Sequence, residues 1–101
     1  YATGAVSGSD STGGFAGGTL SATITSCYYD STTTGQSDTG KGTPYTTTQI
    51  KLQDLNVVIY TNIYVGWDFV NETANGTDNV WSIDTTGTIN GGYPYLTNLV
   101  P

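Results

Sequence analysis

The side chains best suited to chemistry are three carboxylates in the C-terminal half of the chain, Asp68, Asp78 and Asp84. Two carboxylates that face one cleft can hydrolyse a glycosidic bond, one as the acid and the other as base or nucleophile. Acidic residues on the polar side of a strand are, however, usually only solvated. The sequence has no His and no nucleophile beside a base. We therefore expect no catalytic residue and no enzyme.

A second candidate is the segment Gly35–Lys41, which matches a phosphate-binding loop up to its last position. Gly42 stands where such a loop has the Ser or Thr that ligates magnesium. The loop amides reach a phosphate only when a helix follows the Lys, and the Gly-Thr-Pro sequence after Lys41 does not supply one. We do not expect nucleotide binding.

Composition limits the ligands further. With no His and one Cys, zinc is excluded, and calcium could be held only loosely by Asp side chains in turns, so we expect no metal and no cofactor. The net charge is −6, with Lys41 and Lys51 as the two cations, so nucleic acid would be repelled. No apolar run is long enough to span a bilayer, and we expect no membrane insertion.

Two kinds of covalent modification are suggested. Asn71-Glu-Thr and Asn75-Gly-Thr are acceptor sequences for N-glycosylation, so Asn71 and Asn75 are candidate glycan sites. Cys27 has no partner for a disulfide within the chain. We expect a small buried thiol, and a linkage to another chain is the alternative.

The elements that must position these residues are β-strands. About one residue in five is Thr, which suits a pleated surface, and 14 Gly punctuate the chain. Leu20, Ala22 and Ile24 alternate with polar residues, as in a strand with one covered face. Tyr1 aligns with Tyr28 at an offset of 27 residues, which is typical of stacked repeats. The pattern predicts short β-solenoid-like rungs, with Val6, Phe15, Leu20 and Ile24 pointing inward.

Residues 37–101 are expected to follow the repeat of residues 1–36 within one compact domain. Thr46 and Gln49 have the spacing of a capping box, which predicts a short helix near residues 47–55. Residues 65–70 and 81–84 alternate and predict a β-hairpin. Its covered face, together with the closing segment, should form an aromatic core of Trp67, Phe69, Trp81 and Tyr93. The predicted fold class is therefore all-β, with short solenoid-like rungs followed by a small hairpin unit that carries one short helix.

The first part of the chain contains three short motifs in order: Tyr1–Gly8 (YATGAVSG), Gly13–Gly17 (GGFAG) and Ile24–Tyr28 (ITSCY). These motifs resemble successive parts of the GLUG repeat of bacterial and archaeal surface adhesins, and the resemblance extends over nearly the whole chain. The remainder resembles the segment that often ends such arrays, through Tyr29–Asp30, Gly35–Ser37, Gly40–Lys41, Thr47–Lys51, Gly66–Phe69, Val80–Asp84 and Gly92–Leu96. The resemblance implies an extracellular or cell-surface β-solenoid with no catalytic residue.

These patterns predict a structural or adhesive module whose partners are other copies of itself. Because Tyr1 is not an initiator, we expect a processed or excised piece that begins inside a repeat. The resulting open strand edge, at Tyr1, Thr3 and Val6, would invite strand addition and growth into a filament or surface fibre. The alternative is a carbohydrate-binding module that attaches a cell to surface glycans through outward-facing aromatic rings.

Overall fold

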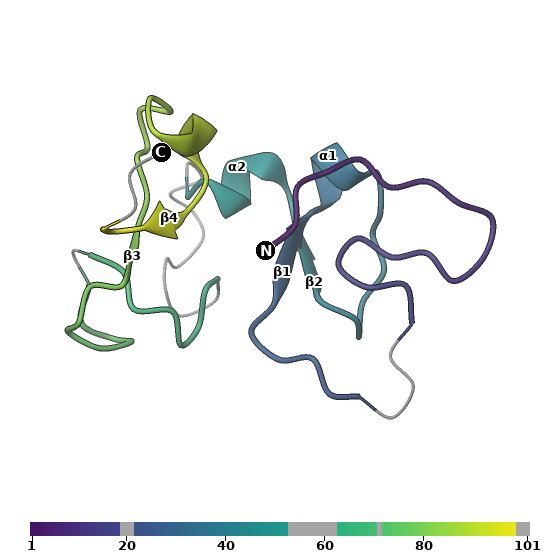
Figure 1. The fold of residues 1–101 in the computed structure, drawn as a ribbon, viewed down its shortest axis with the longest axis horizontal. Helices are drawn as coiled ribbons and strands as arrows, with labels where there is room; N and C mark the ends of the chain where they lie inside the picture. The colour runs from purple at the N-terminus through teal and green to yellow at the C-terminus, as the bar shows by residue number, and fades with distance from the viewer. Residues whose placement is uncertain (19–21, 53–62, 71, 99–101) are drawn as a thin grey trace. The chain divides into compact units, whose positions relative to one another are not determined.

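The fold is described by a computed structural model that covers residues 1–18, 22–52, 63–70 and 72–98 (Figure 1). The chain divides into two compact units, unit 1 (Tyr1–Ile50) and unit 2 (Lys51–Pro101). The repeat pattern of the sequence changes at residue 36, whereas unit 1 continues to Ile50. The reason is that the strand after residue 36 pairs with a strand before it.

Unit 1 is built on three chain segments that run side by side in parallel. Strand β1 (Tyr28–Asp30) pairs in parallel with β2 (Thr43–Tyr45). On the other side of β1, Ala2 forms a parallel bridge with Tyr29, and both backbone polar groups of Ala2 bond to β1, at 3.2 and 2.9 Å. Figure 1 shows the N-terminal segment beside β1. The order across the layer is therefore residues 1–3, β1 and β2.

A buried carboxylate joins β1 to the helix that follows it. Asp30 is fully buried and is the N-cap of helix α1 (Ser31–Thr34). Its Oδ1 accepts hydrogen bonds from the Thr32 and Thr33 amides at 2.9 and 3.0 Å, which satisfies donors that a helix start leaves free. The helix ends at Gly35, whose φ of 71° lies in the left-handed region that favours Gly.

The same carboxylate holds the start of helix α2 (Thr47–Ile50). The Thr47 hydroxyl lies 2.8 and 2.7 Å from the two carboxylate oxygens of Asp30. The capping box predicted at this helix start is confirmed. The Thr46 amide donates to the Gln49 side chain at 2.9 Å, and the Gln49 amide donates to the Thr46 hydroxyl at 3.3 Å.

A second polar contact ties the loops of unit 1 to β1. The buried Tyr29 hydroxyl donates to the Asp38 carbonyl at 2.6 Å and lies 3.2 Å from its Oδ1. That Oδ1 also accepts from the Gly14 amide at 3.0 Å. Gly14 packs on the ring itself, because a Cβ there would lie 2.1 Å from Tyr29 ring carbons. Lys41 completes the network, 4.0 Å from Asp38 Oδ2 and bonded to the carbonyls of Thr12 and Gly17.

Unit 2 is closed by a small aromatic cluster. Ile63, Tyr64 and Phe69 are fully buried. The Tyr64 ring lies 5.0 Å from Trp67 and 5.3 Å from Phe69, and the half-buried Trp67 and Trp81 stack with ring centroids 4.5 Å apart. Offset and tilted ring contacts of this kind add to the free energy gained from burial alone.

The strands of unit 2 are very short. Strand β3 (Trp81–Ser82) pairs antiparallel with β4 (Tyr95–Leu96), after the 3-10 turn η1 (Asn90–Gly92). Phe69 forms a parallel bridge with Trp81 on the other side of β3. Tyr93 is half-buried, and the Lys51 ammonium lies 4.6 Å from the centre of its ring.

The predicted all-β fold with solenoid-like rungs is wrong. The described residues form two two-stranded sheets and two short helices, a mixed α/β arrangement without solenoid closure. Ala2 and Tyr29 are 27 residues apart, as the sequence offset suggested, but Tyr29 and Pro44 are only 15 apart. Solenoid rungs need a constant number of residues between paired positions, and these two separations differ. In addition, a helix starts directly after each strand of this sheet, because Asp30 caps α1 after β1 and Thr46 caps α2 after β2. A solenoid rung would continue as a strand or a turn at these positions.

Three further expectations differ in detail. The predicted hairpin is wrong, because residues 68–70 run parallel to β3 rather than antiparallel. Residues 22–25 form no strand and Phe15 is 38% exposed, so neither builds an inward-facing rung. Helix α2 ends at Ile50, and residues 53–55 of the predicted helix lie outside the described residues, as does Leu20.

Asp30 should be the most sensitive position of unit 1. Asp30→Ala leaves two helix amides and the Thr47 hydroxyl without their acceptor, and should lower the free energy of unfolding by about 3 kcal/mol. Urea denaturation followed by hydrogen exchange of peptides from β1 to α2 would measure this loss. The control is Asp10→Ala at an exposed position, expected to change stability by less than about 0.5 kcal/mol. Equal effects of the two changes would contradict the assignment.

The stability of unit 1 should fall at alkaline pH. Burial, with the nearby Asp38 carboxylate and its hydrogen bond, raises the pKa of Tyr29 from 10.0 to about 12. The unfolded state therefore loses this proton first, and the contribution of Tyr29 is complete below pH 10 and is lost as pH rises toward 12. Urea denaturation across this range should show the stability difference between the wild type and Tyr29→Phe narrowing. A constant difference would argue against the buried phenol.

Candidate functional site

The feature of unit 1 with most potential for function is the edge at residues 1–3, where Ala2 forms a bridge with β1 before the chain bends at Gly4. Ala2 directs both of its backbone groups to β1. Beyond the bend, the Val6 amide donates to the Thr34 carbonyl at 3.0 Å, and the Val6 carbonyl accepts from the Gln36 side chain at 3.1 Å. Backbone groups alternate in direction along an extended strand. Thr3 therefore points its amide and carbonyl away from β1, and neither group forms a hydrogen bond with any part of the chain that the structure describes.

The side chains of this edge suit contact with another strand. Residues 1–8 contain no Asp, Glu, Lys or Arg. Tyr1 is 37% exposed, while Thr3 and Val6 are half-buried. Of the three residues predicted to mediate self-association, Thr3 offers its backbone outward, whereas both backbone groups of Val6 are bonded to Thr34 and Gln36. An uncharged edge with an unsatisfied donor and acceptor is a template for strand pairing.

The three candidate catalytic carboxylates have structural surroundings. Asp68 accepts the Asp78 amide at 2.8 Å and the Asn79 amide at 3.2 Å, so it holds the loop that leads into β3. Asp84 accepts hydrogen bonds from a turn that follows it, and the hydroxyl of Thr86 at 2.6 Å is the largest of the effects that lower the pKa of Asp84. A lowered pKa keeps the carboxylate ionised, which suits an acceptor in a turn and not a general acid.

Glu72, which the sequence patterns did not single out, has the same function as Asp68. Its two carboxylate oxygens accept the Phe69 and Asn75 amides at 3.0 and 2.9 Å. Asn75 in turn accepts the Gly66 amide at 2.9 Å through its side-chain oxygen. In the described part of the chain, no group of three or more His, Cys, Asp or Glu residues is arranged to hold a metal ion.

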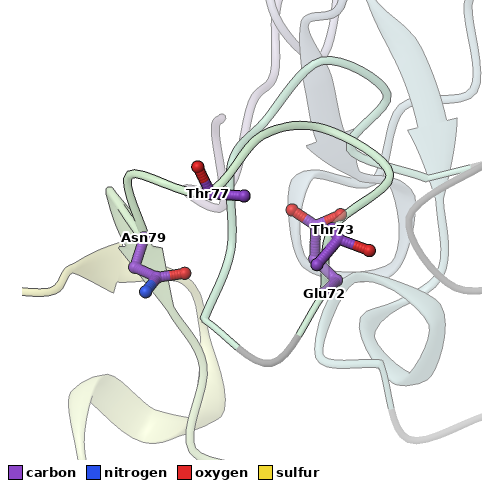
Figure 2. A pocket seen from close by; sticks show the side chains of 4 residues that line it. All are labelled: Glu72, Thr73, Thr77 and Asn79. Atoms are coloured by element: carbon purple, nitrogen blue, oxygen red, sulfur yellow. The ribbon is translucent and has the colours of Figure 1, made fainter.

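The loop of residues 72–79 borders a shallow pocket of about 370 Å³ in unit 2. Figure 2 shows Glu72 and Thr73 on one limb of the loop and Thr77 and Asn79 on the other, all four lining the pocket. Among the described residues, the lining offers hydroxyl, amide and carboxylate groups and no cation. Such a surface can hydrogen-bond a neutral polyhydroxyl ligand and would repel an anion.

The other predicted sites are the glycosylation sequences, the single cysteine and the phosphate-loop candidate. Asn75 is half-buried in the loop of the pocket, and Asn71 lies outside the described residues. Cys27 is half-buried, and its thiol donates to the Thr25 carbonyl at 3.1 Å. Lys41 is engaged with loop carbonyls, and strand β2, not a helix, follows it, so Gly35–Lys41 does not have the geometry of a phosphate-binding loop.

Asp30 carries a sequence signal that predicts its role in the fold. It precedes the Ser31–Thr34 run directly, and an Asp before a run of hydroxyl residues is a helix N-cap signal that could have located α1. No comparable sequence signal marks Asp38, because the Gly14 amide that it accepts is 24 residues away in the sequence. Glu72 accepts amides three residues away on either side, within an irregular loop that follows no helix-capping pattern.

Comparison with known proteins adds one relative. The chain is 40% identical over 91 residues to a protein of Evansella cellulosilytica named "Putative Gly-rich membrane protein". The match covers 84% of this chain but 9% of that relative, so the chain spans less than a tenth of the relative's length. No family model and no solved structure matches the chain. The resemblance to the GLUG repeat therefore stays a prediction.

The helices were also compared with the requirements for crossing a membrane. Within the described ranges, none has the length and apolar character that a membrane span needs.

Proposed function

We propose that this chain is a structural or adhesive module that associates with other copies of itself by strand addition. The observation that carries the proposal is the outward-facing, unbonded backbone of Thr3 at the edge of the parallel layer in unit 1. An added strand would gain backbone hydrogen bonds there without displacing an existing contact. The absence of charged side chains in residues 1–8 removes local repulsion between two copies.

The treatment of polar groups elsewhere supports a structural role. Asp30, Asp38, Asp68, Glu72 and Asp84 all accept hydrogen bonds from the chain's own amides. Acids that hold turns in place are poorly available for acid–base chemistry, which needs a carboxyl free to exchange a proton with a substrate. We accordingly propose no enzymatic activity.

The proposed location is the outer face of a cell membrane. The relative from Evansella cellulosilytica is named a membrane protein, which supports a membrane-associated location for this chain. Thr-rich, weakly charged chains with N-glycosylation sequences suit the extracellular side, so we place the module outside the cell as part of a larger surface protein.

Blocking the edge should weaken self-association. Thr3→Pro removes the outward amide and leaves the bonds of Ala2 intact, and should weaken association by about tenfold or more. Thr3→Val is the matched control, because it keeps the amide and loses only the hydroxyl. Sedimentation equilibrium at micromolar to millimolar concentration measures both, with hydrogen exchange at the Asp30 amide as the check on folding. Equal association of the two variants would disprove the edge contact.

We propose glycan binding at the pocket of unit 2 as the second candidate function. The favouring observation is its lining by two hydroxyls, an amide and a carboxylate without a cation, beside a loop built by Asp68 and Glu72. Neutral sugars are the ligand class that such a lining fits.

Screening against a panel of neutral oligosaccharides would test this candidate. A double change, Thr77→Ala and Asn79→Ala, removes two of the polar groups and should lower the affinity of a bound sugar by about tenfold. The control, Thr86→Ala with Thr88→Ala, removes two exposed hydroxyls outside the pocket and should leave affinity unchanged. Absence of binding by the wild type across the panel would reject the candidate.

A further inference from the structure

The two edges of the parallel layer in unit 1 differ in what they offer to an incoming strand. Thr43 donates its amide to the Cys27 carbonyl at 2.9 Å, so Thr43 and Tyr45 direct their backbone groups toward β1. The backbone nitrogen and carbonyl of Pro44, which lies between them, point to the outer edge of β2, and proline has no amide hydrogen to donate there. The next outward amide is that of Thr46, which already donates to the Gln49 side chain at 2.9 Å. The outer edge of β2 therefore lacks an available donor at both positions.

Head-to-tail growth requires one edge to pair with the other. A strand that paired with Thr3 in parallel would have to supply one carbonyl and one amide to it. The β2 edge of a second copy can supply the Pro44 carbonyl, but the matching amide of Thr46 is occupied by Gln49. A repeating stack would therefore leave half of each contact unbonded, and proline on an edge strand is a common device against such growth.

The edge at Thr3 can instead pair with itself. When two copies meet antiparallel about a two-fold axis through Thr3, each Thr3 amide can donate to the Thr3 carbonyl of the other copy. This is the hydrogen-bonded pair of an antiparallel ladder, in which both residues exchange both bonds. A two-fold contact uses the same surface on both copies and leaves no edge of that kind open for a third.

We infer that self-association through this edge forms a closed, two-fold pair centred on Thr3, and that Pro44 and Gln49 prevent its extension into a filament. The inference rests on the proposed self-association and specifies its geometry. The partner is a second copy of this chain, because the Thr3 edge is uncharged and complementary to itself. With few backbone bonds across it, the contact is weak in solution, and tethering of copies at a surface would raise their effective concentration.

Three sets of variants test the inference. In the wild type, sedimentation up to about 1 mM in physiological salt should show monomers and pairs and no larger species. Pro44→Val with Gln49→Ala restores one outward amide and releases the other, and should convert pairs into open chains visible by negative-stain microscopy. Pro44→Val alone leaves the Thr46 amide bonded to the Gln49 side chain, so it should remain limited to pairs.

Cross-linking locates the axis without a variant that disturbs the edge. Cα atoms in such a pair lie about 5.5 Å apart, inside the disulfide range of about 4.4 to 6.8 Å. In a Cys27→Ser background, Thr3→Cys should therefore form a disulfide-linked pair under mild oxidation. Ser9→Cys, at an exposed position off the edge, should not.

The outcomes separate the inference from the proposed function. A wild type that stays monomeric at every concentration would overturn both. Filaments of the wild type would support self-association and overturn the closed pair. Pairs that cross-link through Ser9→Cys as readily as through Thr3→Cys would also overturn it, because the contact would then lie off the Thr3 axis. Pairs that cross-link through Thr3→Cys and extend only after the double change at Pro44 and Gln49 would support both.

Discussion

Unit 1 depends on a carboxylate that has no access to water. Asp30 is fully buried, and burial of a carboxyl group is costly unless hydrogen-bond donors surround it. Those donors come from the first turn of α1 and from Thr47, which begins α2. Strand β1 and both helices must therefore assemble together for the acid to be satisfied. In a chain with 36% hydrophobic residues, a polar contact takes a position that an apolar core would usually fill.

Unit 2 also combines apolar burial with buried or half-buried acceptors, but aromatic rings contribute more of its core. A cluster of aromatic rings around Tyr64 and Phe69 provides the apolar burial. Asp68, Glu72 and Asp84 then fix the loops by accepting backbone amides that have no partner in a ladder. Short strands leave many backbone amides without a partner strand. In both units, carboxylates accept hydrogen bonds from amides that longer strands would pair with carbonyls. This use of acids favours a structural role for the chain over a catalytic one.

Because the parallel layer of unit 1 is small, both of its outer segments have an edge that pairs with no other strand among the described residues. The two edges differ in the backbone donors that they offer. Pro44 and the Thr46–Gln49 capping box remove the donors on one side, and the capping box also starts α2. Thr3 keeps its donor and acceptor on the other side. In the pair that we infer, this asymmetry would limit how far strand addition can extend, and it would connect a local helix-start motif to self-association.

The sequence by itself determined the features that depend on neighbouring residues. The capping box was predicted because hydroxyl and amide side chains three residues apart bond within one turn. The 27-residue offset equals the separation of Ala2 and Tyr29, but the stacked rungs that it predicted do not form in the described residues. Only the tertiary structure decided the fold class, the parallel pairing of Phe69 with Trp81 and the acceptor roles of the carboxylates. Asp38 and Asp68 accept amides that are 24 and 10 residues away in the sequence. Periodicity predicts which face a side chain occupies but not which amide lies beside it.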